Sequence, residues 1–162
     1  MIIVSNTTPL IGLASIQRFD LLRLLFGAII IPPAVYEEAV TRGREAGGDR
    51  REVSSAPWIA ITPAKDRLAV EVLMDELDSG EAETVILASE ICADWTLMDE
   101  RKGRRKLAKL GLKKIGTVGI LLAAKKAGYI HMIRPEIEKL RQNAFSISQE
   151  IVDSILLQAN EA

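Results

Sequence analysis

The fold is decided by residues 95–105, which read WTLMDERKGRR. The first four of these residues form a short apolar run typical of a buried strand, and the run ends directly on Asp99. A carboxylate there lies where open α/β sheets bind their ligands, outside the carboxyl ends of the strands. The start of the chain has a similar arrangement, because the apolar run 1–4 leads into Ser5 and Asn6. Two strands that deliver metal-competent side chains to one edge suggest a metal-and-phosphate site.

Length and composition narrow the classes of protein. The chain has 162 residues, 48% of them apolar, which fits one globular domain with a real core. Aromatic residues make up only 4% and the net charge is −1, so neither an aromatic stacking platform nor bulk positive charge is expected to bind nucleic acid. Cys92 falls in an apolar helical pattern and is expected to be an inert core residue. With a single histidine, His131, any catalysis must rest on carboxylates.

Strand-like and helix-like segments alternate along the chain. Apolar runs predict strands at 2–5, 28–31, 58–62, 95–98 and 113–115, and amphipathic patterns predict helices at 10–16 (after a helix start at 6–9), 20–26, 33–44, 64–77, 78–93, 100–110, 116–126, 135–142 and 148–160. Leu68 and Val72 are expected to face inward, and Ile151, Ile155 and Leu156 form a stripe that packs on the domain or contacts a partner. Residues 45–57 predict a surface loop. The pattern indicates an α/β fold with a mostly parallel central sheet.

Oxygen ligands fall near four predicted strand ends or helix starts. The candidates are Asn6, Glu38 (or Glu37), Glu81 (or Glu83) and Asp99. Such oxygens suit hard cations like Mg²⁺ and Mn²⁺, which can activate water for phosphodiester cleavage. Each residue also has an ordinary structural interpretation. Glu81 can form a capping box with Asp78, the Glu37–Glu38 pair can be a solvated helix face, and Asp99 can cap the helix that follows. Glu81 and Glu83 lie about 200° apart on a helix, so only one of them can face a given site.

A basic segment follows Asp99 immediately. Residues 101–114 hold eight lysines or arginines and no acid, among them Arg101, Arg104 and Arg105. A solvated helix face is the usual role of such a run, but its position behind Asp99 favours contacts with phosphate. Residues 116–119, GTVG, lie at a strand-to-helix turn and offer backbone N–H groups and the Thr117 hydroxyl to an anion.

Together these stretches resemble the PIN-domain family, which includes the VapC-type toxins of prokaryotic toxin–antitoxin pairs. Within it the chain is most similar to a prokaryotic subgroup described as predicted nucleic-acid-binding proteins. The stretches that match, in the family's order, are VSNTTPLIGLA at 4–14, IIIPPAVYEEA at 29–39, LDSGEAETVILA at 77–88, TLMDERKGRRKLAKLGL at 96–112 and IGTVGILLAAKKAG at 115–128.

The resemblance implies a three-layer α/β/α sandwich and an endoribonuclease dependent on Mg²⁺ or Mn²⁺. Carried over, the catalytic residues are Asn6, Glu38, Glu81 and Asp99, with Asn6, Glu81 and Asp99 as metal ligands. The implied nucleic-acid-binding residues are Thr8, Arg101, Arg104, Arg105 and Thr117. The implied domain covers 1–130, with 131–162 as a helical extension packed on it. RNA, expected to be single-stranded, is the implied substrate, and a small antitoxin and a second copy of the chain are the implied partners.

Asn6 departs from the family pattern, because most PIN nucleases have aspartate at this position. This leaves a second interpretation open, a catalytically weak or inactive RNA-binding or regulatory module. A phosphotransfer receiver domain would need an acidic pair after the first strand, and Ser5-Asn6 does not supply it. With no basic flank of a signal peptide and no apolar run of ~20 residues, we expect no membrane association and a cytoplasmic protein.

Overall fold

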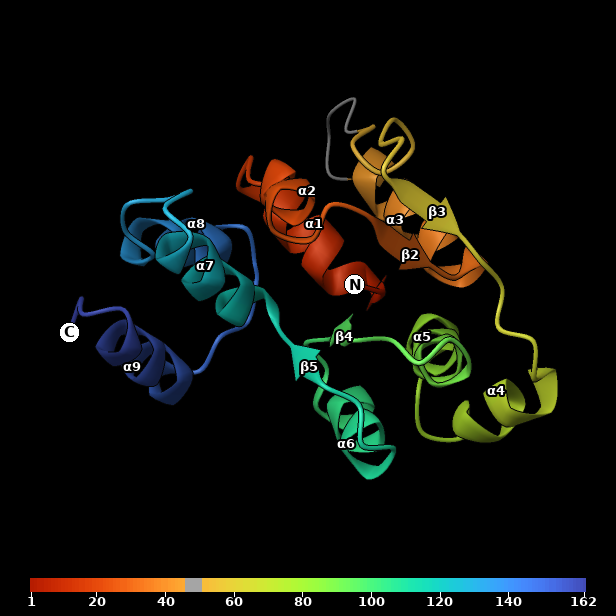
Figure 1. Ribbon diagram of the computed structural model, residues 1–162. Coiled ribbons are helices and arrows are strands. Elements are labelled where there is room, and N and C mark those ends of the chain that lie inside the picture. The colour runs from red at the N-terminus through yellow and green to blue at the C-terminus, as the bar shows by residue number, and fades with distance from the viewer. Residues whose placement is uncertain (46–50) are drawn as a thin grey trace.

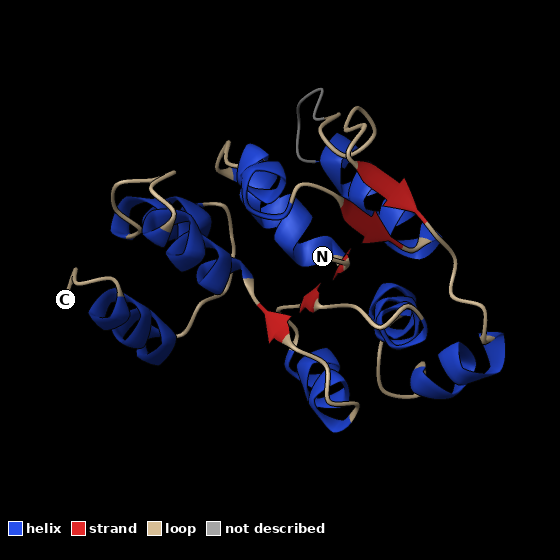
Figure 2. Cartoon of the chain, in the orientation of Figure 1, coloured by secondary structure: helices blue, strands red, loops and turns tan. Residues whose placement is uncertain are grey.

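The computed structural model describes residues 1–45 and 51–162. Its centre is a five-stranded parallel sheet in the order β3-β2-β1-β4-β5. The strands are β1 (Ile3–Ser5), β2 (Ile29–Ile31), β3 (Ile59–Ile61), β4 (Trp95–Leu97) and β5 (Lys114–Ile115). They are short and lie between much longer helices (Figure 2). The described helices are α1 (Thr7–Ser15), α2 (Asp20–Phe26), α3 (Pro33–Glu45), α4 (Arg67–Leu73), α5 (Ser79–Glu90), α6 (Arg101–Lys109), α7 (Thr117–Lys126), α8 (Arg134–Gln142) and α9 (Gln149–Gln158).

The two faces of the sheet bury two separate apolar clusters. Successive strand residues point to opposite faces, so Ile3 joins the cluster that contains α1, α2 and α7–α9, while Val4 joins the one with α4–α6. The two groups of helices lie on either side of the sheet in Figure 1. This arrangement confirms the predicted three-layer α/β/α fold.

The C-terminal helices belong to the first cluster. Ile137 and Leu140 of α8 and Val152 and Leu156 of α9 are buried in the same core as β1 and α1. The division of the chain at residue 130 stays a prediction, although the packing joins both parts in one core. In the described part of the chain, no helix is long and apolar enough to cross a membrane.

Three expectations from the sequence are wrong. Helix α4 begins only after its cap Asp66, and it buries Val70 instead of Leu68 and Val72, which are 75% and 62% exposed. Helix α5 ends at Glu90, two residues before Cys92, so this thiol is exposed in the following turn at φ +53°. In the predicted loop 45–57, residues 46–50 lie outside the described residues.

The third expectation that is wrong concerns the stripe of Ile151, Ile155 and Leu156 on α9. Ile155 and Leu156 are buried as expected, but Ile151 is 54% exposed. It lies in the first turn of α9, beyond the edge of the packed face, and lines a cavity described below.

Candidate active site

The candidate site lies where the strand order reverses. β1 and β4 are neighbours, and from them the sheet extends to β2 on one side and β5 on the other. Ligands of open α/β sheets bind outside the carboxyl ends of the strands at such a switch point. Asn6 follows β1 and donates its backbone N–H to the Leu97 carbonyl of β4 (3.0 Å). Asp99 and Glu100 follow β4, so the sheet brings an amide and two carboxylates to one edge.

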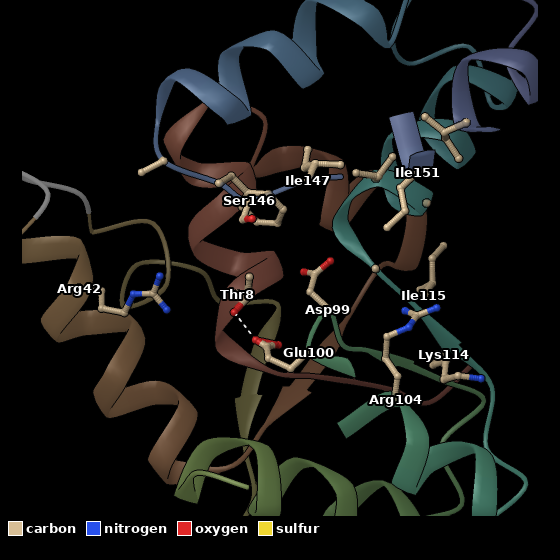
Figure 3. Close-up of a pocket in the computed structure, with 16 residues that line it drawn as sticks. Thr8, Arg42, Asp99, Glu100, Arg104, Lys114, Ile115, Ser146, Ile147 and Ile151 are labelled. Atoms are coloured by element: carbon tan, nitrogen blue, oxygen red, sulfur yellow. Dashed lines mark hydrogen bonds between the residues drawn. The ribbon is translucent and has the colours of Figure 1, made fainter. Parts of the chain in front are cut away.

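Glu100 joins the ends of the two strands. Its Oε1 accepts from Asn6 Nδ2 (3.0 Å) and its Oε2 accepts from Thr8 Oγ1 (2.7 Å; Figure 3). Glu100, and not Asp99, is the N-cap residue of α6, yet its side chain makes no capping bond. Glu100 was not among the residues predicted from the sequence, although its position directly after Asp99 at a strand end was a usable signal.

Helices α3 and α5 add further oxygens around Gly80. A Cβ built on this glycine would lie 3.2 Å from Glu38 Oε2, 3.5 Å from Asn6 Oδ1 and 3.6 Å from Asp78 Oδ1. Three oxygens from separate parts of the chain therefore surround a space that any larger residue would fill. Asp78 also caps α5 by accepting the Glu81 backbone N–H (2.8 Å), as half of the predicted capping box requires.

The carboxylates of this edge form one electrostatic group. Burial, a side-chain hydrogen bond with Asp78 and the charges of Asp78, Glu100 and Glu38 raise the pKa of Glu81 to about 8. Repulsion between nearby acids favours the protonated form of one of them. The group is therefore poised to take up a cation or a proton. The predicted alternatives lie elsewhere, because Glu37 is exposed and the buried Glu83 pairs with Arg67 (3.5 Å).

Asp99 turns away from this group toward α7. Its Oδ1 accepts the Thr117 backbone N–H (2.8 Å), and its Oδ2 accepts from the Thr117 hydroxyl (2.6 Å). A Cβ on Gly116 would lie 2.7 Å from Asp99 Oδ1, so this glycine permits the close approach. The anion held by the predicted 116–119 turn is thus the chain's own Asp99. Burial raises the pKa of Asp99, the bonds from Thr117 oppose the rise, and the charge of Glu100 adds to it.

A cavity of about 670 Å³ opens beside the two carboxylates (Figure 3). Arg104 and Lys114 line it, and Arg104 Nη1 donates to the Met98 carbonyl (2.8 Å). Arg42 also lines it and pairs with Glu38 (3.3 Å). Arg101 and Arg105 are exposed on α6 and are not among the described residues that line the cavity. Sequence reasoning did not single out Arg42, nor the segment 144–147 that forms another wall.

The oxygens do not form a closed metal site as they stand. Among the side chains that the structure describes, those of residues 1–42 and 51–162, no group of three or more His, Cys, Asp or Glu is arranged to hold a metal ion. Two features of the site explain this: one of the oxygens at Gly80 is an amide, and both Asp99 and Glu100 are turned to hydroxyl and N–H donors.

Open parallel α/β domains bind ligands at such a switch point, and the basic residues beside the acids suit an anionic ligand. A family model described as PIN domain matches residues 2–161, so the chain belongs to the PIN-domain family. PIN domains are generally nucleases and generally use divalent metal ions. No curated protein matches the chain.

Proposed function

We propose that this protein is a metal-dependent endoribonuclease that hydrolyses RNA phosphodiester bonds at the carboxyl edge of β1 and β4. The observation that supports it most is the convergence of Asn6, Glu38, Glu81 and Glu100 from separate elements, with Asp99 adjacent. Membership of a family of nucleases supports the same reaction class.

The oxygens fit a hard divalent cation in their chemistry. The space above Gly80 is bounded by amide and carboxylate oxygens, the donors that Mg²⁺ and Mn²⁺ prefer. We assign the metal to Asn6, Glu81 and Asp99, which requires the Asp99 carboxylate to turn from Thr117 toward the space above Gly80, and add Glu38 as the fourth catalytic residue. When bound, the cation would stabilise the negative charge that develops at phosphorus. Without a cation the pKa of Glu81 is about 8, so its carboxyl holds a proton at neutral pH, and a bound divalent cation would favour its ionised form as a ligand.

The remaining site residues have supporting roles in this proposal. Thr8 and Thr117 fix the Glu100 and Asp99 carboxylates through hydrogen bonds of 2.7 Å and 2.6 Å and act as positioning residues. Arg104 lies in the cavity and contacts phosphate directly, whereas Arg101 and Arg105 attract the strand from the exposed side of α6. Single-stranded RNA is the proposed substrate.

One observation favours a second candidate, an RNA-binding module with little or no catalysis. The amide of Asn6 donates a hydrogen bond to Glu100, so it stabilises this carboxylate without any cation. An aspartate at this position could not donate that bond and would add a further negative charge. A site with Asn6 should therefore bind a cation more weakly than a site with aspartate at this position.

The partners proposed for the protein rest on the family resemblance. We propose that it acts in the cytoplasm, where its RNA substrates are, as the toxin of a toxin–antitoxin pair. A small antitoxin protein and a second copy of the chain are then its protein partners.

The test is cleavage of a labelled single-stranded RNA in the presence of Mn²⁺, Mg²⁺ or chelator, by the parent protein and by the Asp99→Asn and Asn6→Asp variants. We expect the parent to cut only with metal, Asp99→Asn to lose cutting and Asn6→Asp to cut faster. Cutting by Asn6→Asp alone would favour the second candidate. No cutting and no RNA binding by any of the three would reject both.

A further inference from the structure

The cavity beside Asp99 has two chemically different halves (Figure 3). One half contains the carboxylates Asp99 and Glu100 and the cations Arg104 and Lys114. The other half is apolar and is lined by Ile115, Val118, Phe145, Ile147 and Ile151. The proposed reaction uses only the polar half, so the apolar half has no role in it.

The apolar wall is held in place by the chain that connects α8 and α9. The Phe145 N–H donates to the Leu140 carbonyl (3.0 Å), and Arg141 Nη2 donates to the Ile147 carbonyl (2.9 Å). The Phe145 ring lies against α1, because a Cβ on Gly12 would be 2.9 Å from its Cε2. These contacts fix the segment 144–147 relative to α1, so the wall is part of the folded structure.

The wall presents apolar surface to the open space. Ile151 is 54% exposed although it belongs to the same helix as the buried Val152 and Ile155. Exposed and half-buried apolar side chains that face the same cavity as the cations Arg42, Arg104 and Lys114 suit a ligand with both an anionic and an apolar, flat part. The cavity volume of about 670 Å³ is in the range of sites that hold such ligands.

We propose that the apolar half is a nucleobase subsite, which holds one unpaired base of an RNA strand whose phosphate lies against Arg104 and Lys114. This inference rests on the proposed function and specifies its substrate. A base must leave its stack to enter the subsite, so single strands bind and duplexes do not. Because aliphatic side chains offer no hydrogen-bonding pattern, the subsite accepts any base, and affinity depends on the presence of a base more than on its identity.

The test measures binding of labelled RNA in chelator, by fluorescence anisotropy, so that cleavage does not enter. The ligands are a single-stranded RNA and an abasic ribose-phosphate chain of the same length. The variants are Ile151→Ala and, as a matched control on the same helix, Leu157→Ala, whose side chain is 68% exposed and does not line the cavity. We expect Ile151→Ala to weaken RNA binding about 5-fold and to leave abasic binding unchanged, from the apolar contact removed. Leu157→Ala should change neither.

Two results would overturn the subsite while leaving the proposed nuclease intact. One is unchanged RNA binding by Ile151→Ala in a protein that still cuts RNA with metal. The other is an equal loss for RNA and for the abasic chain, which would show that Ile151 affects phosphate binding only. A parent dimer that dissociates in Ile151→Ala without any change in RNA binding would assign the wall to a second copy of the chain. Failure of the parent to bind RNA would overturn the subsite and the proposed function together.

Discussion

Asp99 and Glu100 are consecutive acids at the end of one strand, yet they serve opposite sides of the site. Both Asp99 oxygens accept from Thr117 of α7, and both Glu100 oxygens accept from Asn6 and Thr8, which follow β1. Successive side chains at a strand end point in different directions, so each carboxylate meets donors from a different element. The hydrogen-bond donors that distant segments supply, and not the residue type, therefore decide what each acid does.

The part of the site around Asp99 and Thr117 (the Asp99 half) and the part around Glu100, Asn6 and Thr8 (the Glu100 half) are nevertheless coupled by charge. Glu100 raises the pKa of Glu81 on one side and of Asp99 on the other. Changes confined to one half therefore test whether the halves act as one site.

The largest effects are expected around Gly80, and Gly80→Ala alters the Glu100 half alone. The new Cβ would lie 3.2 Å from Glu38 Oε2 and 3.5 Å from Asn6 Oδ1, in the space that the metal requires. Metal-dependent cleavage should fall roughly 100-fold, as for other small displacements of a reacting group. Ser79→Ala, in the same helical turn and exposed, is the control for the rate measurement. Equal rates for both variants would show that this space is not used.

Thr117→Val and Thr8→Val compare the Asp99 half with the Glu100 half through the free energy of unfolding. Thr117 is fully buried, so loss of its hydroxyl leaves the Asp99 carboxylate short of a bond and should cost about 2 kcal/mol in the free energy of unfolding. Thr8 is only half-buried and Glu100 keeps the bond from Asn6, so Thr8→Val should cost about 1 kcal/mol.

Urea unfolding measures both variants. Thr96→Val is the matched control, because the buried Thr96 hydroxyl has no hydrogen-bond partner in the described structure and its loss should not destabilise the protein. A larger loss in the free energy of unfolding for Thr8→Val than for Thr117→Val would show that the Glu100 half depends more on its hydroxyl donor than the Asp99 half does.

The raised pKa of Glu81 predicts a pH-dependent stability. The folded protein holds this proton more tightly than the unfolded chain, with a pKa of about 8 against 4.5. The resulting stabilisation is complete below about pH 4.5 and is lost as the pH rises toward about 8. Water screens this partly exposed group, so we expect the loss to be about 1 kcal/mol.

Unfolding of the parent and of Glu81→Gln at both ends of this pH range tests the prediction. Glu81→Gln should lack this component of the pH dependence, and Mn²⁺ should stabilise the parent more at the alkaline end. Parallel pH profiles for the two proteins would contradict the assignment of the raised pKa to Glu81.

The smallest effect is expected from the arginines that lie beyond both carboxylates. Arg101→Ala and Arg105→Ala should each lower the salt dependence of RNA binding by about 0.7 in the log–log slope, as loss of one phosphate contact does. Arg23→Ala on α2, where Arg23 bonds Asp20, serves as the control. Slopes equal to that of the parent would place the RNA strand away from the outer face of α6.

The strands and most helices followed from local patterns, because apolar runs and caps are encoded within a few residues. Helix α4 did not, because Val70 is its one buried residue, whereas the apolar periodicity of residues 64–77 predicted a longer helix that buries Leu68 and Val72. In the site, strand ends and helix starts predicted Asn6, Asp99 and one of Glu81 and Glu83 near one edge, and the family resemblance favoured Glu81. The donors to each carboxylate could not be predicted, because Asp99 and Thr117, and Asn6 and Glu100, are far apart in sequence and meet only through the packing of β1, β4 and α7.

The most direct test of the account compares Glu81→Gln with Glu83→Gln. Both substitutions remove one carboxyl group from α5, but Glu81 belongs to the acidic group at the end of β1, whereas Glu83 pairs with Arg67. The measurement is the rate of Mn²⁺-dependent cleavage of a single-stranded RNA. We expect a loss of roughly 100-fold for Glu81→Gln and a change of no more than about 3-fold for Glu83→Gln. Equal effects of the two substitutions, or cleavage that persists in chelator, would contradict it.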